Sequence, residues 1–231
     1  MLAFTTFLSL AALAPLLNVS GLVLKRSGCS LSGVKLSNLP SPLVAPSSPA
    51  SFVGIAIGTQ NYTCSSTGTY TNVGALAELF DASCVYNTPI FSSLPGIVSA
   101  AWEIAPPSLP VSEVISTLHG FSTDSVLGQH YYVTNPITGS GIDPKWDFTS
   151  QGADAGKSDA FVVAAKVNGA SAPTGSQDID WVQLGALTGN LAKQVYRVQT
   201  RLGQPPASCT VGSKDIQVKY TALYYGFGGS V

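Results

Sequence analysis

The sequence predicts a mainly β protein, an antiparallel β-sandwich or barrel-like single domain with one or two short helices. Short runs rich in β-branched and aromatic residues recur along the chain and alternate with turn-forming stretches. The 231 residues include 23 glycines and 15 prolines, which favour turns and interrupt long helices. A chain of this length suits one domain, and it contains no repeat of the length that is typical of solenoids.

The predicted strands begin after residue 50. The clearest is the run IQVKYTALYYGF at 216–227, in which apolar and polar residues alternate. We expect the run at 194–201 to pair with it antiparallel and to contain a bulge, because its alternation is interrupted. Residues 58–64 are either a second strand or the bent continuation of the first. The other expected strands lie at 51–58, 128–134, 161–167 and 179–187.

Helical patterns are few. In the run VGALAELF at 73–80, Leu76, Leu79 and Phe80 fall at i, i+3 and i+4, which predicts a short helix. Residues 94–110 are rich in proline, and an irregular segment is expected there. Residues 112–118 fit a helical turn or a short strand.

The N-terminus has the composition of an export signal. The first 17 residues are apolar or small and uncharged, and no other stretch reaches the roughly 20 apolar residues of a membrane-spanning helix. The pair Lys25-Arg26 is either a dibasic processing site or two solvated charges. We therefore expect a protein secreted to the extracellular space or cell wall. The expected organisation is a signal peptide (1–20), a candidate propeptide (21–26), a Pro/Ser-rich extension (27–50) and a β-rich domain (51–231).

Four cysteines follow the predicted signal, at positions 29, 64, 84 and 209. An even number in an exported chain predicts two disulfides, and three connectivities are open. We favour Cys29–Cys84, which would fix the N-terminal extension, and Cys64–Cys209, which would join an early strand to a late one. The absence of a C-x-x-C pair argues against a zinc site.

A sequon for N-glycosylation occupies Asn61-Tyr62-Thr63. In a strand, Asn61 and Tyr62 would point to opposite faces. A glycan is therefore predicted at Asn61 on an open face.

The charge balance limits the classes of partner. The formal net charge is −1 and only 10% of the residues are charged, against about 25% in an average soluble protein. This excludes the strongly basic surface that nucleic acids or anionic membranes require. The expected partner is a cell-wall polysaccharide or another extracellular ligand.

Signatures of the common cofactors are missing from the sequence. It contains no G-x-G-x-x-G at a strand–helix junction, no Walker A loop and no G-x-S-x-G nucleophile elbow. Its two histidines cannot form a three-histidine metal site. We therefore expect neither a cofactor nor a bound metal.

Three residues are candidates for catalysis. His130, among strand aromatics, would be a general base or a ligand anchor, or else a structural histidine with a satisfied hydrogen bond. Asp178 and Asp180 would share one strand face, where paired carboxylates can divide acid and base roles. The alternative is that these aspartates cap the backbone of a turn.

Three further residues are candidates for binding. Trp146 and Asp147 place an aromatic ring beside a carboxylate. Arg197 lies in an otherwise apolar strand and needs a partner, for which Asp178 and Asp180 are the candidates. A structural salt bridge is the simpler interpretation, and recognition of an anion is the alternative.

Several segments carry a resemblance to a known family. They are Gly58-x-Gln60-Asn61-Tyr62-x-Cys64, Gly128-Gln129-His130-Tyr131, Pro144-Lys145-Trp146-Asp147-Phe148, Asp178-x-Asp180-Trp181-x-x-Leu184, Tyr196-Arg197-Val198-x-Thr200, Gly203-x-Pro205-Pro206-x-x-Cys209 and Val218-x-Tyr220-x-Ala222-x-Tyr224. In this order they resemble the domain of unknown function 3455 family, from about residue 29 to the C-terminus. Fungal secreted members of that family often carry the label malate dehydrogenase.

The resemblance implies a secreted β-rich domain of fungi and bacteria, and it transfers no catalytic residue. It also implies that bacterial relatives retain counterparts of Cys64 and Cys209 but not of Cys29 and Cys84, which supports the favoured pairing. Dehydrogenase activity is not expected, because the chain has no dinucleotide fingerprint and no βαβ alternation, and export would separate it from cellular NAD.

The expected function is that of a non-catalytic extracellular or cell-wall-associated binding or surface protein. The alternative is a glycan-active hydrolase that uses Asp178, Asp180 or Asp147 with His130. Convergence of His130, Trp146, Asp180 and Arg197 on one open pocket would indicate a functional site; scattered or buried positions would indicate structural roles.

Overall fold

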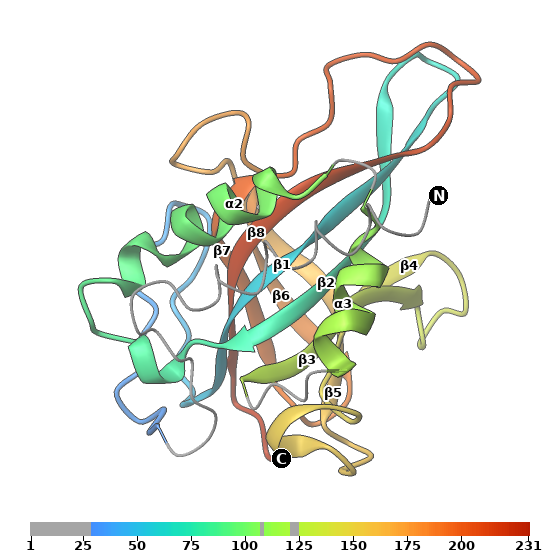
Figure 1. The fold of residues 1–231 in the computed structure, drawn as a ribbon. Coiled ribbons are helices and arrows are strands. Elements are labelled where there is room, and N and C mark those ends of the chain that lie inside the picture. The colour runs from blue at the N-terminus through green and yellow to red at the C-terminus, as the bar shows by residue number, and fades with distance from the viewer. Residues whose placement is uncertain (1–28, 107–108, 121–124) are drawn as a thin grey trace.

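Eight antiparallel strands form a closed barrel in which each strand pairs with the next and β8 pairs back with β1 (Figure 1). The computed structural model describes residues 29–106, 109–120 and 125–231, so the predicted signal peptide and propeptide lie outside the described residues. The prediction of a mainly β, barrel-like domain is confirmed. The strands are β1 (Ala50–Cys64), β2 (Tyr70–Asp81), β3 (Val126–Thr134), β4 (Ile142–Asp147), β5 (Phe161–Ala170), β6 (Trp181–Thr188), β7 (Gln194–Leu202) and β8 (Ile216–Phe227).

The long strands of the barrel agree with the sequence pattern. Residues 58–64 continue β1 as one strand, with an irregular register at Asn61/Tyr62. Strands β7 and β8 pair antiparallel, and the expected irregularity in β7 lies between Val198 and Arg201. Strand β4 occupies a segment where no strand was expected, because Pro144 interrupts its pattern.

The helix predicted at 73–80 is wrong, because these residues belong to β2. Ala77 and Leu79 pack inside the barrel, whereas Phe80 packs in an outer cluster and Leu76 packs under the helices. A strand that is buried on both faces loses the polar–apolar alternation that identifies strands. Its continuous apolar run therefore resembled a helical pattern by chance.

The prediction of an irregular segment at 94–110 is also wrong for residues 94–104, which form a helix. Helix α2 spans Leu94–Ile104 and α3 spans Val111–Gly120. Pro95 occupies the first turn of α2, where its missing N–H costs no intrahelical hydrogen bond. None of the helices in the described part of the chain is both long and apolar enough to cross a membrane.

Helix α2 is attached to the outside of the barrel by its C-terminal turn. The buried Trp102 donates its indole N–H to the carbonyl oxygen of Gly58 at 2.9 Å. Lys219 donates to the carbonyl oxygens of Trp102, at 2.8 Å, and Ala105, and so satisfies acceptors that a helix end leaves open. Figure 1 shows α2 and α3 on the outer surface of the barrel.

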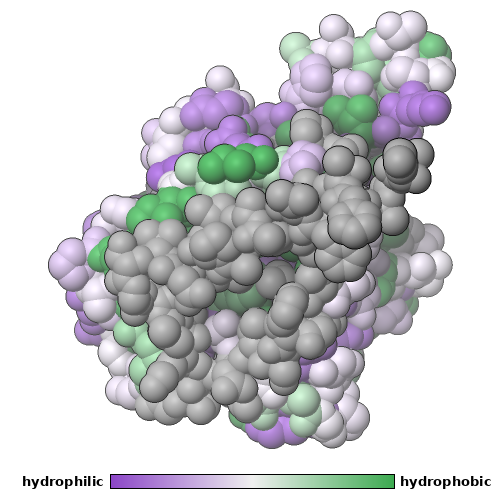
Figure 2. Space-filling model, in the orientation of Figure 1, coloured by the Kyte–Doolittle hydropathy of each residue, from purple (hydrophilic) through white to green (hydrophobic). Residues whose placement is uncertain are grey.

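The barrel wall separates two hydrophobic layers. The inner cluster includes Phe52 and Phe148, whose ring centroids are 5.1 Å apart. The outer cluster includes Tyr196 and Leu223 and is covered by the segment around Val34 and by α2. On the face shown in Figure 2, hydrophilic and hydrophobic residues lie side by side.

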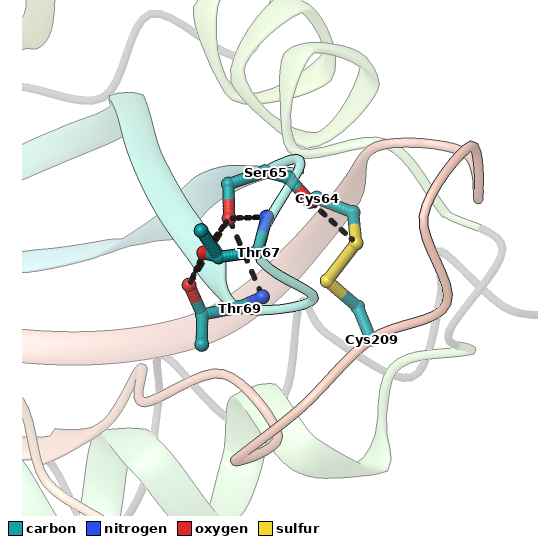
Figure 3. Close-up of a disulfide and its surroundings, with 5 residues drawn as sticks. All are labelled: Cys64, Ser65, Thr67, Thr69 and Cys209. Carbon is teal, nitrogen blue, oxygen red and sulfur yellow. Dashed lines mark hydrogen bonds between the residues drawn. A yellow bond between two sulfur atoms is a disulfide. The ribbon is translucent and has the colours of Figure 1, made fainter.

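Two disulfides join Cys29 to Cys84 and Cys64 to Cys209, the two pairs that the sequence favoured. The second joins the β1–β2 hairpin to the loop between β7 and β8 (Figure 3). The backbone N–H of Cys209 also donates to the carbonyl oxygen of Gly68 at 2.9 Å. The hairpin and this loop together form an arm that extends beyond the barrel (Figure 1).

Asn61 has the orientation that its sequon requires. It is partly exposed on the outer side of β1, whereas the neighbouring Tyr62 is buried on the inner side. Glycosylation of Asn61 stays a prediction.

Candidate functional site

A cavity of about 490 Å³ lies inside the barrel, toward the end that carries the β1–β2 hairpin. All eight strands contribute residues to its wall. The opposite end is filled by buried side chains such as Phe52, Phe148 and Leu191. The lining residues are Gln60, Tyr62, Tyr70, Asn72, His130, Tyr132, Ile142, Asp143, Pro144, Trp146, Lys166, Ile179, Asp180, Val182, Leu184, Arg197, Gln204, Pro205 and Tyr224.

Four of the candidate residues converge on this cavity. His130, Trp146, Asp180 and Arg197 all line it, although they come from four different parts of the chain. Asp180 and Arg197 are partly exposed, whereas His130 and Trp146 are each 1% exposed and have the buried positions expected of structural residues. Their convergence follows from the strand order, because β3 pairs with β4 and β6 pairs with β7, and from alternation, which turns these side chains inward.

His130 and Trp146 form a stacked pair in the cavity wall. They are register partners on β3 and β4, and their ring centroids lie 4.5 Å apart with an interplanar angle of 13°. The Nδ1 of His130 lies 3.0 Å from the carbonyl oxygen of Lys145, to which it donates. This assigns the neutral tautomer in which Nε2 is an acceptor.

Burial lowers the pKa of His130 to about 3, although its hydrogen bond to the Lys145 carbonyl opposes this change. The imidazole is therefore neutral at physiological pH. Such a weak base is poorly suited to general base catalysis near neutrality, but its acceptor atom and ring suit it to binding.

Two buried donors in the wall have no hydrogen-bond partner among the described residues, the Nε1 of Trp146 and the Nε2 of Gln60. Trp146 is 1% exposed and Gln60 is 2% exposed. The amide oxygen of Gln60 accepts a hydrogen bond from Asn72 at 3.1 Å. Unpartnered buried polar groups are rare. The Oγ of Ser51 and the Nε1 of Trp181 are two others, and those residues do not line the cavity.

Arg197 places a full positive charge in the cavity wall. Its Nε and Nη2 donate to the backbone carbonyl oxygen of Asp180 at 3.2 and 3.0 Å. Burial acts to lower the pKa of Arg197, but the neighbouring hydroxyl groups of Tyr224, Tyr132 and Tyr220 outweigh this and raise it. The guanidinium therefore stays charged.

The salt bridge expected between Arg197 and Asp178 or Asp180 is not formed. Arg197 binds the main chain of Asp180, and within the described ranges no carboxylate lies at ion-pair distance from it. The reason is that Asp180 precedes β6 and presents its carbonyl group, rather than its side chain, to β7.

Asp178 has the capping role that was the alternative for the aspartate pair. It is 2% exposed, and its carboxylate accepts hydrogen bonds from the hydroxyl of Thr174 and from the backbone N–H of Leu202, the latter at 2.5 Å. It does not line the cavity. The hydrolase hypothesis required the carboxylates of Asp178 and Asp180 to face the same space. They do not, because only Asp180 lines the cavity.

Asp147 points away from the cavity, on the opposite face of β4 from Trp146. Its carboxylate pairs with Lys145 at 2.7 Å and accepts from the hydroxyl of Tyr131 at 2.7 Å. Partial burial raises the pKa of Asp147, but bonds from Lys145, Thr149 and Tyr131 outweigh this and lower it to about 2. It cannot act together with His130 inside the barrel.

The tyrosines of the site were not singled out from the sequence. Tyr62, Tyr132 and Tyr224 line the cavity, and Tyr220 joins Tyr224 through hydroxyl groups 3.1 Å apart. Tyr62 donates to the carbonyl oxygen of Gly203 at 2.8 Å. Tyr220 and Tyr224 are four positions apart in β8, which places both on one face of the strand. This alternation is the sequence signal that could have identified these two tyrosines.

The site combines a partly buried cation, several hydrogen-bond donors and apolar walls, which is the composition of a binding cavity. In the described part of the chain, no three His, Cys, Asp or Glu side chains are grouped as metal ligands.

Comparison with curated proteins and comparison with solved structures found no match. A family model does match, over residues 46–228, which includes all eight strands and the entire cavity wall. The chain therefore belongs to the family described as Protein of unknown function (DUF3455).

Proposed function

We propose that this is a secreted, non-catalytic binding protein of the extracellular space or cell wall, which holds a small organic ligand inside its barrel. The observation that carries the proposal is the cavity of about 490 Å³, a volume within the range of small-molecule sites. The two disulfides support secretion, because such bonds persist in oxidising compartments.

The same residues give little support to the alternative of a glycan-active hydrolase. Glycosidases need two carboxyl groups on either side of one bond. Asp178 accepts hydrogen bonds from Thr174 and Leu202, and Asp147 lies outside the barrel with Lys145, so Asp180 is the one candidate carboxylate that lines the cavity. The other carboxyl group of the wall, that of Asp143, accepts a hydrogen bond from Asn135. His130, with its pKa of about 3, does not supply the missing acid or base.

The shape of the cavity also narrows the expected partner. All eight strands surround it, and buried side chains fill the barrel at the far end. Such a cavity suits a small extracellular molecule, or the terminal unit of a cell-wall polysaccharide, better than an internal stretch of a polymer.

Titration with N-phenyl-1-naphthylamine, a neutral probe whose fluorescence increases in apolar surroundings, tests the proposal. The substitution Val182→Trp fills the cavity, because Val182 lines it and is 8% exposed. The matched control is Val167→Trp on the outer surface, where Val167 is 59% exposed.

We expect saturable binding by the wild type and by Val167→Trp, and loss of binding in Val182→Trp. A thermal melt of each variant establishes that it is folded. Equal binding by folded Val182→Trp and wild type would place the probe elsewhere and contradict the proposal, as would the absence of saturable binding to the wild type.

A further inference from the structure

We infer that the cavity selects organic anions, whose acidic group binds the guanidinium of Arg197 and whose apolar body lies against the wall formed by Tyr132, Ile179 and Val182. This inference rests on the proposed function, and it adds the chemical class of the ligand.

The first argument is the incomplete pairing of Arg197. A guanidinium has five N–H donors. Two bonds go to the carbonyl oxygen of Asp180, and Tyr224 accepts a further one. The remaining donors belong to a side chain that lines the cavity, and a carboxylate or similar oxyanion matches their planar arrangement.

The second argument is that the surrounding protein does not neutralise this charge. Burying an unpaired charge is costly, and the cost falls when an opposite charge binds beside it. Two carboxylates also belong to the wall, those of Asp143 and Asp180. Asp143 accepts a hydrogen bond from the Nδ2 of Asn135 at 2.6 Å, and among the described residues neither carboxylate lies at ion-pair distance from Arg197.

The third argument is the surplus of donors in the same wall. The Nε1 of Trp146 and the Nε2 of Gln60 have no partner among the described residues, and both side chains line the cavity. Neither nitrogen atom has accessible surface in this structure, so a ligand reaches them when the neighbouring side chains of the wall shift. These two donors are independent of Arg197, and they favour a ligand rich in acceptor oxygens.

The fourth argument is the apolar surface beside the charge. Ile179, Val182 and Leu184 line the same cavity and are buried. Apolar walls strengthen the attraction between Arg197 and an anion, because they exclude water from it. They also suit an organic body rather than an inorganic ion alone.

Two probes that differ by one acidic group test the inference. 1-Anilinonaphthalene-8-sulfonate is N-phenyl-1-naphthylamine with a sulfonate added. We expect the wild type to bind the sulfonate at least about tenfold more tightly, which is the effect of one charge-assisted interaction. Arg197→Gln should abolish this advantage and retain affinity for the neutral probe. The control is Arg201→Gln on the same strand, because Arg201 does not line the cavity, and it should preserve the advantage.

A second measurement needs no variant and so does not depend on the folding of Arg197→Gln. Displacement of N-phenyl-1-naphthylamine from the wild type is compared for 2-naphthoate and 2-naphthalenemethanol. We expect the carboxylate to displace the probe at least about tenfold more effectively.

The outcomes separate the inference from the proposed function. If the neutral probe binds in the cavity and the anionic compounds show no advantage, the inference is overturned and the proposed function stands. If the advantage persists in folded Arg197→Gln, the assignment to Arg197 is overturned. If Val182→Trp leaves the binding of both probes unchanged, the proposed function itself fails.

Discussion

Asp178 positions the main chain to which Arg197 is bonded. Its carboxylate accepts from the N–H of Leu202, and the hydroxyl of Thr200 donates to the carbonyl oxygen of Ile179 at 2.6 Å. These bonds fix the segment before β6 against the irregular part of β7, where Leu202 has a φ of 59°. The carbonyl group of Asp180 that binds Arg197 belongs to this segment.

Replacing Asp178 with Ala removes the acceptor of two partly buried hydrogen bonds, from the hydroxyl of Thr174 and from the N–H of Leu202. We expect a loss of about 1–3 kcal/mol in the free energy of unfolding, measured by urea denaturation. Asp178→Asn keeps one acceptor and should lose less. Asp215→Ala, at an exposed position, is the control and should change the free energy by less than about 0.5 kcal/mol. An equally small change for Asp178→Ala would contradict the capping role.

Glu78 makes the stability of the barrel depend on pH. Burial raises its pKa from 4.5 to about 8, although a hydrogen bond from Gln129 acts in the opposite direction. The folded state therefore retains a proton that the unfolded state has released. The free energy of unfolding should fall as the pH rises from 4.5 to about 8, by about 1.4 kcal/mol for each pH unit within this window.

The substitution Glu78→Gln removes this titration and keeps the shape of the side chain. We expect the free energy of unfolding, measured by urea denaturation at several pH values, to become flatter with pH than that of the wild type. Parallel pH profiles for the two proteins would show that Glu78 does not carry the effect.

Single residues differ in how well the sequence predicted them. Four of the candidates converge on the cavity. His130 and Arg197 lie in segments that were predicted as strands, whereas Trp146 lies in β4, where no strand was expected. The partner of Arg197 could not be inferred, since it is a carbonyl group and every residue has one. Asp178 and Asp180 are two positions apart, but both precede β6, and Asp178 forms an isolated β-bridge with Gly203.

At the scale of elements, the helix prediction for β2 failed because this strand is buried on both of its faces. The outer face of β2 lies under α3 and its inner face lies in the barrel, so apolar residues predominate on both faces and the alternation that marks a strand is lost. Glu78 is a buried exception on the outer face. The prolines around α2 lie at its first turn and beyond its end, where they are compatible with a helix. Whether a proline is compatible with a helix depends on its position within the helix, and the proline content of a segment does not specify that position.

The arm formed by the β1–β2 hairpin and the loop before β8 makes part of the cavity mouth. Tyr70 and Asn72 come from the hairpin, whereas Gln204 and Pro205 come from the loop. The Cys64–Cys209 disulfide joins these two segments (Figure 3). It therefore holds both sides of the mouth together.

Replacement of Cys64 and Cys209 by serine should lower both stability and ligand affinity. The loop-entropy model predicts a loss of about 5 kcal/mol in the free energy of unfolding for a disulfide that spans 145 positions, and the separated walls should weaken the binding of N-phenyl-1-naphthylamine. The control replaces Cys29 and Cys84, which lie away from the mouth; it should lower stability and leave the affinity unchanged. Equal affinities in both double variants would show that the arm does not shape the site.

For the molecule as a whole, the sequence predicted the mainly β class and left a sandwich and a barrel open, and the structure is a closed barrel. The sequence also predicted that the last two strands pair. The cavity itself could not be predicted, because it depends on how side-chain volumes fill a closed barrel. Phe52 and Phe148 fill one end, whereas the charged Arg197 and the hydroxyl groups around it line the space at the other.

A crystal structure of the protein with 2-naphthoate bound tests the central claim most directly. The account predicts the naphthalene ring inside the barrel beside Val182, with its carboxylate on the guanidinium of Arg197 and within reach of the Nε1 of Trp146 or the Nε2 of Gln60. A ligand bound only on the outer surface of the barrel, or bound inside with its carboxylate directed away from Arg197, would contradict it.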